Sequence, residues 1–356
     1  MSTADLEPPL IRMPHFGPGE WLNSAGPLTH QGLRGRVVLV DFWDYSCVNC
    51  VRTLPYLRAW QERYADLGLS IIGVHAPEFR FAHDRQQVHA ALDRFDLVYP
   101  VLLDNAYETW DRYATHAWPT KFLIDARGYI RRRQQGEGGY GSFEAAIRAL
   151  LLERNPDLPL PPPLPPLRAE DAAGAVCYPT TPELYAGYES AGFFHTPGLG
   201  NPPDFLSDSP LIYELPQERA RDRFYLSGIW RIEAEAVVFA GQEAGELRLR
   251  YRGVGVNAVL SWSSDPVALR LDLRPESDPG RIELLQDGVP LPAFAAGVDI
   301  VLSDGALPAV YPDRPRMYHL VQNPAYGEHE LTLYFRGVGL SLYTFTFTSC
   351  IVDDSL

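Results

Sequence analysis

The stretch VVLVDFWDYSCVNCVRTLP, residues 37–55, decides the fold of this chain. Its first part, 37–43, is apolar except for one aspartate and is rich in β-branched side chains, a pattern typical of a buried strand. A short polar turn follows, and apolar residues then recur at helical spacing. Cys47 and Cys50 lie at this turn. The sequence therefore predicts a strand that runs into a helix, with a dithiol at the helix N-terminus.

The spacing of Cys47 and Cys50 is typical of a redox-active dithiol. Backbone N–H groups and the helix dipole favour the thiolate of the first cysteine, and the second cysteine lies one turn away, within reach of a disulfide. We predict that Cys47 attacks a substrate disulfide and that Cys50 resolves the mixed disulfide. The pair itself would be the redox centre, without any other cofactor.

The alternatives for the CxxC pair are half of a zinc site or two buried apolar residues. A zinc site needs a second pair of ligands at suitable spacing. His75 and His83 belong to the same region but lack paired spacing, because one falls at a strand end and the other in a helix. We therefore predict no metal.

Asp41 interrupts the apolar strand, and a buried acid is costly unless it is neutral, paired or used. Burial should raise its pKa toward neutrality, which would suit it to accept the proton of Cys50. The alternative is a structural aspartate that accepts hydrogen bonds from backbone N–H groups.

Asp41 to Trp43, the two cysteines and Pro55 together resemble the active-site strand and helix of thioredoxins. Several segments resemble the extracytoplasmic thioredoxin-like part of DipZ proteins, near the TlpA group: FWDYSCVNCVRTLPYLRAW, GVHAPEF, YPVLLDN, WPTKFLID and GEGGY. The resemblance implies an α/β thioredoxin-like fold for residues 1–154 and thiol-disulfide oxidoreductase activity on protein disulfides. It also implies that Asp41 exchanges a proton with the resolving cysteine.

The segment Trp118-Pro119-Thr120 precedes the predicted strand 122–125. In a thioredoxin-like fold this is where a cis-proline faces the dithiol, so the resemblance implies a cis bond before Pro119. It further implies substrate binding by Trp118, Pro119 and Trp43. Plain packing is the alternative for Trp118, which is large for this position.

The sequence also departs from thioredoxin around the dithiol. Asn49 stands where thioredoxin has proline, and Ser46 replaces its tryptophan, so the reducing or oxidising direction cannot be predicted from the motif. Peroxiredoxins place proline and threonine at fixed positions ahead of the peroxidatic cysteine. Val40 and Asp44 occupy those positions here, so we do not expect peroxidase activity.

The chain has 356 residues, which is enough for two domains with separate cores, and a net charge of −14. This charge argues against nucleic acid or an anionic membrane as a partner. The N-terminus lacks a basic region followed by an apolar core, and no run reaches the ~18 apolar residues of a membrane span. As written, the sequence predicts a cytoplasmic protein, or an extracytoplasmic one if its N-terminus has been trimmed. Lys121 is its single lysine, to which we assign no function.

Strand and helix patterns alternate in the first domain, which predicts a mostly parallel sheet with helices on both faces. We expect strands at 37–43, 69–74, 98–103, 122–125 and 129–134, with a short edge strand at 21–22. We expect helices after the dithiol up to Gly68, and at 81–95, 104–113 and 142–154. Glu137 and Tyr140 belong to the GEGGY motif, whose glycines allow positive φ.

Residues 155–168 form a proline-dense segment, which predicts a stiff, extended linker between the two domains. Residues 169–356 contain about eight short alternating strands, which predicts an all-β sandwich of jelly-roll type. The expected strands are 228–240, 246–251, 256–261, 268–273, 281–286, 317–321, 329–335 and 342–351. Such folds are common among carbohydrate-binding modules. Four aromatic residues are candidates for stacking on sugar rings, with core packing as the default: Trp230, Trp262, Tyr311 and Tyr343.

Cys177 and Cys350 flank the second domain. In an oxidising compartment they would form a disulfide, and in a reducing cytosol they would be buried thiols. The N-terminal sequence favours free thiols. The predicted partners are a protein or small-thiol disulfide and an upstream thiol reductant, with a glycan on the sandwich as a third candidate. The competing function is a glycan- or protein-binding module whose dithiol serves only as a sensor or link.

Overall fold

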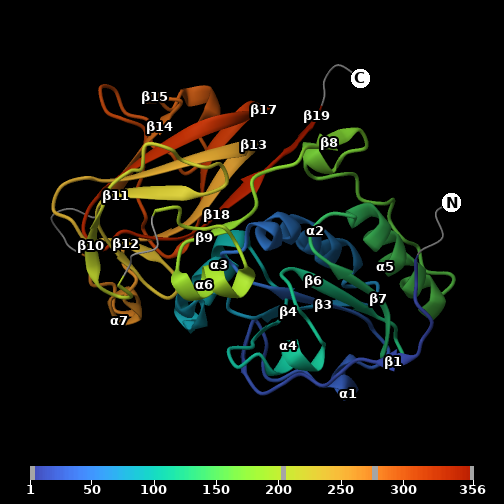
Figure 1. Ribbon diagram of the computed structural model, residues 1–356. Coiled ribbons are helices and arrows are strands. Elements are labelled where there is room, and N and C mark those ends of the chain that lie inside the picture. The colour runs from blue at the N-terminus through green and yellow to red at the C-terminus, as the bar shows by residue number, and fades with distance from the viewer. Residues whose placement is uncertain (1–4, 202–205, 275–279, 353–356) are drawn as a thin grey trace. The chain divides into compact units, whose positions relative to one another are not determined.

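The computed structural model of the protein describes residues 5–201, 206–274 and 280–352 (Figure 1). The chain divides into two compact units, Met1–Ala172 and Ala173–Leu356. Each unit has its own main sheet and its own cluster of buried apolar side chains. The first unit mixes helices and strands, whereas the second is rich in β-structure.

The first unit is built on a seven-stranded sheet in the order β1-β7-β6-β3-β4-β5-β2. Its strands are β1 (Ile11–Arg12), β2 (Glu20–Leu22), β3 (Val37–Trp43), β4 (Leu69–His75), β5 (Val101–Leu103), β6 (Thr120–Ile124) and β7 (Tyr129–Gln135). β3 is central, buried along its whole length, and has the limits that its sequence predicts. The predicted edge strand is also confirmed as β2.

The expectation of a mostly parallel sheet is wrong. The pairs β3–β4 and β4–β5 are parallel, whereas β3–β6, β6–β7, β1–β7 and β2–β5 are antiparallel. A tight turn at Gly128 joins β6 to β7 as a hairpin, which accounts for the antiparallel direction of that pair.

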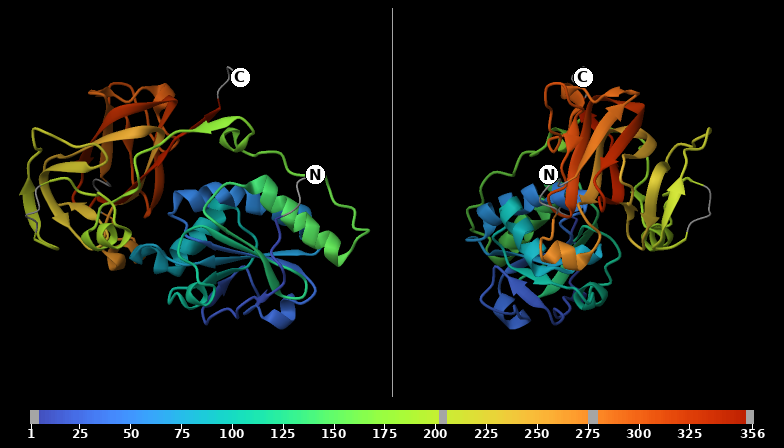
Figure 2. Two further views of the ribbon diagram at one scale, coloured as in Figure 1. Left: turned by 45° about the vertical axis from the view of Figure 1, so that its right-hand side comes forward. Right: turned by 90° about the vertical axis from the view of Figure 1, so that its left-hand side faces the viewer.

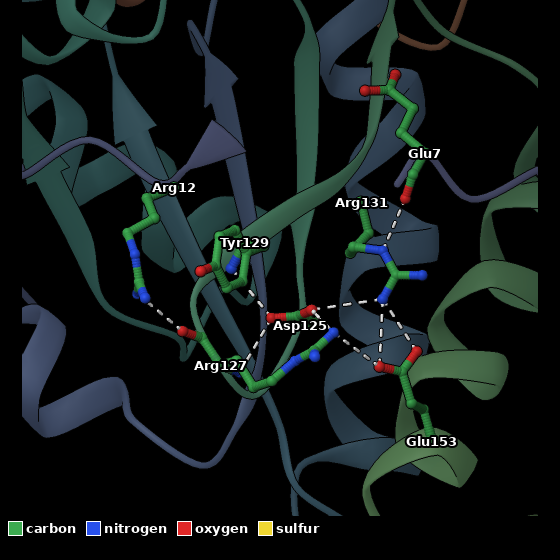
Figure 3. A network of polar contacts seen from close by, with 7 residues as sticks. All are labelled: Glu7, Arg12, Asp125, Arg127, Tyr129, Arg131 and Glu153. Carbon is green, nitrogen blue, oxygen red and sulfur yellow. Dashed lines mark hydrogen bonds and ion pairs between the residues drawn. The ribbon is translucent and has the colours of Figure 1, made fainter. Parts of the chain in front are cut away.

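A polar network holds this turn to the unit (Figure 3). Asp125 accepts hydrogen bonds from the backbone N–H groups of Arg127 and Tyr129, both at 3.0 Å. Arg131 on β7 donates to the Glu153 carboxylate at 2.9 Å and to the Glu7 carbonyl at 2.7 Å. The network thus joins the β6–β7 hairpin to the helix that carries Glu153 and to the N-terminal segment.

Helices cover both faces of this sheet, as predicted. α2 (Val48–Tyr64) and α5 (Tyr140–Arg154) lie on one face, and α1 (His30–Leu33) and α4 (Glu108–Arg112) lie on the other (Figures 1 and 2). α2 and α5 pack through aromatic rings, since Trp60 stacks on Phe143 with centroids 5.6 Å apart.

Two predicted helices of this unit start later than expected. The predicted helix 81–95 is a 3-10 turn, η1 (Arg80–His83), followed by α3 (Arg85–Phe95), because Asp84 caps α3 by accepting the N–H of Gln86 at 2.7 Å. Asp104 does accept N–H groups of the next helix, from Thr109 at 3.0 Å and Trp110 at 2.8 Å, but that helix, α4, begins only at Glu108.

The proline-dense segment lies along α2 and α5 within the first unit. The backbone N–H of Leu164 donates to the Glu144 carboxylate on α5 at 2.9 Å, and the N–H of Leu167 donates to the Tyr56 hydroxyl on α2 at 2.8 Å. Arg63 and Arg148 donate to the carbonyls of Pro162 and Pro161. The segment is therefore held against two helices along part of its length.

The second unit contains a ten-stranded sheet. Its strands are β9 (Leu184–Tyr185), β10 (Pro210–Tyr213), β11 (Phe224–Ile232), β12 (Val237–Phe239), β13 (Gly245–Ser261), β14 (Arg281–Gln286), β15 (Val289–Pro290), β16 (Ala309–Val310), β17 (Arg316–Arg336) and β18 (Ser341–Thr348). β11 and β18 each pair with both β12 and β13, which closes a circuit of pairings. The β-rich class is confirmed, whereas the jelly-roll type stays a prediction.

Strand limits in this unit differ from the predicted ones. The two strands predicted at 246–251 and 256–261 are one strand, β13, whose register shifts between Gly253 and Gly255. Likewise, the strands predicted at 317–321 and 329–335 are one strand, β17. The glycines and polar residues that suggested loops are accommodated by register shifts in long paired strands.

The strand predicted at 268–273 is wrong, because this segment begins with a helix, α7 (Pro266–Arg270). The Asp265 side chain accepts the N–H of Val267 at 2.8 Å, and Pro266 occupies the first turn. An aspartate cap followed by proline is a helix-start signal that the strand interpretation overlooked.

The aromatic residues proposed for sugar stacking are mostly inside the second core. Trp230, Trp262 and Tyr343 are buried, and Trp230 packs edge-on against Phe239 and Phe335 at 5.3 and 4.9 Å between centroids. Tyr311 is the exposed member of the four. Core packing, the default interpretation, therefore holds for three of the four residues, and their ring faces are not available to a glycan.

Cys177 and Cys350 form a disulfide, so the preference for free thiols is wrong. Cys177 ends β8 (Ala175–Cys177) and Cys350 begins β19 (Cys350–Val352), and the antiparallel pairing of these strands places the two residues directly opposite each other. Neither cysteine is buried. The pairing of β8 with β19 brings the two ends of the unit together and places the two sulfurs within bonding distance.

Candidate active site

The turn before α2 is shaped by Asp44, which is fully buried. One of its carboxylate oxygens accepts the N–H of Ser46 at 2.7 Å, and the other accepts the N–H of Glu78 at 3.1 Å. Its carbonyl accepts the N–H of Cys47 at 3.3 Å. These contacts fix the chain between β3 and α2 so that Cys47 becomes the N-cap of the helix. The sequence interpretation did not include this role of Asp44.

Both cysteines of the CxxC pair are free thiols in this structure. The N–H of Cys50 donates to the sulfur of Cys47 at 3.3 Å. Cys47 is partly exposed, whereas Cys50 is 1% exposed. The accessible thiol is therefore Cys47 and the shielded one is Cys50, which is the arrangement that the proposed attacking and resolving roles require.

The protonation of the pair differs from the expectation. Burial raises the pKa of the Cys47 thiol well above its ordinary value, and the Cys50 thiol beside it adds to this effect. The N–H of Cys50 acts in the opposite direction but does not outweigh burial. Burial likewise raises the pKa of Cys50. The N–H of Cys50, which lowers the pKa of the Cys47 thiol, is in place, but desolvation raises that pKa by more.

Asp41 lies on β3, on the sheet face that α2 and α5 cover. It is 1% exposed, and neither carboxylate oxygen has a hydrogen-bond partner in the described part of the chain. Burial raises its pKa to about 7, and the charge of Lys121 opposes this shift. The structural alternative, a carboxylate bonded to backbone N–H groups, does not fit these unpartnered oxygens.

Lys121 is the residue that the sequence analysis missed. It lies on β6 directly opposite Asp41 and is fully buried. Its ammonium group donates to the carbonyl of Gly136 at 3.0 Å. Burial lowers the pKa of Lys121, while Asp41, Cys50 and Glu137 raise it. A lone lysine next to an apolar run was the signal that the sequence offered, whereas its pairing with the buried acid appears only in the strand register.

The bond between Trp118 and Pro119 is cis, as the resemblance implies. The indole N–H of Trp118 donates to the carbonyl of Ala76 at 2.9 Å, and its ring packs against Trp110 at 4.4 Å between centroids. Pro119 is buried, and its carbonyl accepts the N–H of Gly136 at 2.7 Å. These contacts hold the cis-proline loop to the end of β4 and to the GEGGY segment.

Trp43 is fully buried and packs edge-on against His75 at 5.3 Å between centroids. Its side chain does not reach the surface, so we withdraw it from the candidate substrate contacts. His75 ends β4, with Nε2 at 3.4 Å from a carboxylate oxygen of Asp44. Burial lowers the pKa of His75, which favours the neutral imidazole.

The GEGGY motif packs on the active-site helix. Glu137 forms an ion pair with Arg52 of α2 at 3.1 Å, and the Tyr140 hydroxyl lies 3.2 Å from the Thr53 hydroxyl. The glycines at 136, 138 and 139 have positive φ, as predicted. The motif therefore contacts the active-site helix through Glu137 and Tyr140, and its first residue, Gly136, accepts the hydrogen bond of Lys121.

Among the residues that the structure describes, no group of three or more His, Cys, Asp or Glu side chains is arranged to bind a metal ion. Within the same residues, no helix combines the length and the apolar character needed to cross a bilayer.

Comparison with known families agrees with this geometry. Residues 20–133 match the AhpC/TSA family, and residues 181–348 match a family described as the thioredoxin-like C-terminal domain. The protein DipZ of Mycobacterium tuberculosis is 34% identical over 252 residues, which is 70% of this chain. The chain carries a thioredoxin-like domain and is a homologue of DipZ. It spans about a third of the length of that relative, 35%.

Other relatives match the thioredoxin-like unit of this chain. The thiol-disulfide oxidoreductase YkuV of Bacillus subtilis is 26% identical over 138 residues, which cover 38% of this chain and 91% of YkuV. A solved structure of a putative thiol:disulfide interchange protein DsbE from Chlorobium tepidum is 24% identical and covers 40% of this chain and 96% of its own, with a TM-score of 0.35. The ResA protein of Bacillus cereus, also named as a thiol-disulfide oxidoreductase, is 30% identical over 118 residues, which cover 33% of this chain and 65% of ResA.

Proposed function

We propose that the CVNC dithiol of the first unit exchanges electrons with protein disulfides. The observation that carries the proposal is the arrangement of three groups. Cys47 is accessible at the N-terminus of α2, Cys50 is shielded behind it, and Asp41 is buried without a hydrogen-bond partner. A carboxyl whose pKa lies at about 7 can both take up and release a proton near neutral pH.

In the reducing direction, Cys47 first loses its proton to solvent. Its sulfur then attacks one sulfur of the substrate disulfide, and the other sulfur leaves as a thiolate. Cys50 then gives its proton to the Asp41 carboxylate and attacks the sulfur of Cys47. This step forms the Cys47–Cys50 disulfide and releases the second substrate sulfur. A thiol reductant of the cell returns two electrons and two protons to the pair. The same steps in reverse would oxidise a substrate dithiol.

We propose that the substrate chain lies against the cis-proline loop, next to the accessible thiol. The indole of Trp118 is held by the Ala76 carbonyl and by Trp110. An indole fixed in this way would favour substrate segments that are extended near their disulfide.

We propose an extracytoplasmic location, the second of the two locations that the sequence left open. The Cys177–Cys350 disulfide favours an oxidising compartment, where such bonds persist. We also propose the domain limits 1–154, 155–168 and 169–356. The glycan-binding alternative has lost its basis, because three of its four aromatic residues are buried in the core.

The test is turnover of a protein disulfide by four forms of the full chain: wild type, Cys47→Ser, Cys50→Ser, and the double variant Cys177→Ala/Cys350→Ala. We expect Cys47→Ser to lose turnover and Cys50→Ser to accumulate a mixed disulfide with the substrate. The double variant is the matched control, because it removes two cysteines outside the site, and it should retain turnover. Normal turnover by Cys47→Ser would refute the proposal.

The direction follows from the reduction potential of the dithiol, measured by equilibration with glutathione or dithiothreitol. A value near that of thioredoxin, about −270 mV, would assign a reductase, and a value near that of strong oxidants, about −120 mV, would assign disulfide formation. A pair that does not cycle at all would contradict both.

A further inference from the structure

A cavity of about 660 Å³ lies in the first unit, away from the dithiol. It reaches the start of β3, where Val38 pairs with Ile124 of β6, whereas the dithiol follows the other end of β3. β3 has seven residues, which corresponds to roughly 20 Å of strand. The cavity is therefore separate from the site described above.

The segments that frame this cavity are hydrogen-bonded to one another. The N–H of Met13, which follows β1, donates to the carbonyl of Gly128 in the β6–β7 turn at 3.0 Å. The Nε2 atom of His30 on α1 lies 2.8 Å from the Pro14 carbonyl. Because a carbonyl can only accept a hydrogen bond, this ring nitrogen carries a hydrogen. The walls are thus held in place by backbone groups without any ligand.

The cavity has an apolar floor and one flat wall. Four buried apolar side chains form the floor: Met13, Leu33, Val38 and Ile124. The imidazole rings of His15 and His30 also line the cavity and stack on each other, with centroids 3.9 Å apart and an angle of 9° between their planes. A ligand that contacts these groups needs an apolar, preferably planar body.

The cavity is also lined by two arginines that lack an acidic partner. Arg12 lies over the Tyr129 ring at 4.4 Å and donates to the Arg127 carbonyl at 3.3 Å (Figure 3). Within the part of the chain that the structure describes, neither Arg12 nor the exposed Arg34 forms an ion pair with a carboxylate. Asp125, the acid of the lining, is already paired with Arg127 at 3.1 Å. Two uncompensated positive charges therefore face one cavity in a chain whose net charge is −14.

These features together suit a small organic acid. Guanidinium groups bind carboxylates through paired, charge-assisted hydrogen bonds. Small-molecule sites of roughly 300–1,000 Å³ combine apolar walls with a few polar groups that orient the ligand. We propose that this cavity binds an aromatic carboxylate, with its ring on the apolar floor and the imidazole wall and its acid group at Arg12 and Arg34. This binding activity goes beyond disulfide exchange and does not depend on it.

A methionine provides a reporter inside the cavity. The chain has three methionines, of which Met13 belongs to the floor and Met317 is buried in β17 of the second unit. The full chain, labelled with ¹³C in the methionine methyl groups, is titrated with naphthoate and followed by NMR. The Met13 signal should shift, because the ring current of bound naphthoate acts on its methyl group. The Met317 signal should stay in place, and Met13→Leu assigns the Met13 signal.

The same titration tests the arginines. Arg12→Leu and Arg34→Leu should each raise the dissociation constant of naphthoate by about tenfold, because a charge-assisted hydrogen bond is lost. Arg133→Leu is the matched control. Arg133 is exposed on β7, donates to the Ala114 carbonyl at 3.1 Å and lies over the Phe122 ring at 5.6 Å, but it does not line the cavity. Its loss should change the constant by less than about twofold.

Two further ligands separate the parts of the proposal on the wild-type chain, so this comparison does not depend on whether a variant folds. Naphthamide has the same rings without the charge and should bind about tenfold more weakly than naphthoate. Acetate has the charge without the rings and should not displace naphthoate at equal concentration. The proposal is overturned if millimolar naphthoate leaves the Met13 signal unmoved, if naphthamide or acetate binds as tightly, or if Arg133→Leu weakens binding as much as Arg12→Leu.

Discussion

Each unit buries a cluster of polar side chains, and the two clusters differ in how their hydrogen bonds are satisfied. In the second unit, Tyr251, Gln286 and Asn323 form a closed ring of hydrogen bonds at 2.8, 2.9 and 2.8 Å, and all three side chains are neutral. In the first unit, Asp41 and Lys121 are buried and ionisable, and the Asp41 oxygens have no hydrogen-bond partner among the described residues.

This difference indicates where a group that can exchange a proton is to be expected. A neutral network whose members satisfy one another rigidifies a core and offers no group that can exchange a proton. An unsatisfied acid keeps its lone pairs available, and its pKa is set by burial and one nearby charge. The cysteines follow the same division, because Cys47 and Cys50 are free whereas Cys177 and Cys350 are bonded to each other.

The largest expected effect tests the structural side of this comparison. Cys177→Ala/Cys350→Ala opens a loop with a sequence separation of 173 residues, and the chain-entropy model gives a loss of about 5 kcal/mol for loops of this size. Urea unfolding of the wild type and the double variant, followed by tryptophan fluorescence, measures the loss. Dithiol turnover should be unaffected. A parallel loss of turnover would mean that the two units are not separate in function.

The second prediction concerns the pH dependence of stability. The pKa of Asp41 is about 7 in the folded protein against about 3.9 in an unfolded chain, so folding penalises its ionisation. A raised pKa means that the stability contribution is complete below pH 4 and is lost as the pH rises to about 7. Asp41→Asn removes this loss. The variant should gain stability relative to the wild type from pH 4 to pH 7, by up to about 4 kcal/mol.

Urea unfolding of the reduced proteins at pH 4, 5.5, 7 and 8 measures the gain. The relevant quantity is the change with pH in the stability difference between Asp41→Asn and the wild type. The effect of burying an amide in place of a neutral acid does not depend on pH and cancels in this change. A difference between variant and wild type that stays constant over this range would show that Asp41 is ionised in the folded protein.

Much of the dithiol site could be predicted from the sequence. The apolar run 37–43 and the CxxC spacing place β3, α2 and the dithiol, and an acid within an apolar strand identifies Asp41. Lys121 was missed because its meaning depends on register, and the pairing of β3 with β6 is non-local. The same limit applies to Cys177 and Cys350, whose contact arises from the pairing of two strands at opposite ends of the second unit.

Local signals explain the other differences. The Gly128 turn fixes an antiparallel hairpin, and the Asp265 cap fixes a helix where the apolar pattern suggested a strand. The periodicity of apolar residues thus predicts whether most segments form a helix or a strand. Turn and cap chemistry decided the cases where periodicity was ambiguous.

The smallest expected effect compares two buried threonines, one in each unit. Thr53 on α2 donates to the Asn49 carbonyl at 2.9 Å and lies 3.2 Å from the Tyr140 hydroxyl, whereas Thr344 on β18 donates to the Leu184 carbonyl at 3.2 Å. Substitution by valine keeps the shape and removes the hydroxyl. Each variant should lose about 1 kcal/mol of stability in urea unfolding, the usual net value of such hydrogen bonds.

The two threonine variants should differ in turnover. Thr53→Val removes one of the contacts between the active-site helix and the GEGGY motif, so disulfide turnover should fall by about threefold or more, the equivalent of roughly 0.7 kcal/mol. Thr344→Val should leave turnover within experimental error, because its partner Leu184 belongs to the core of the second unit. Equal effects of both substitutions on turnover would mean that general loss of stability, and not the link between α2 and the motif, accounts for the change in activity.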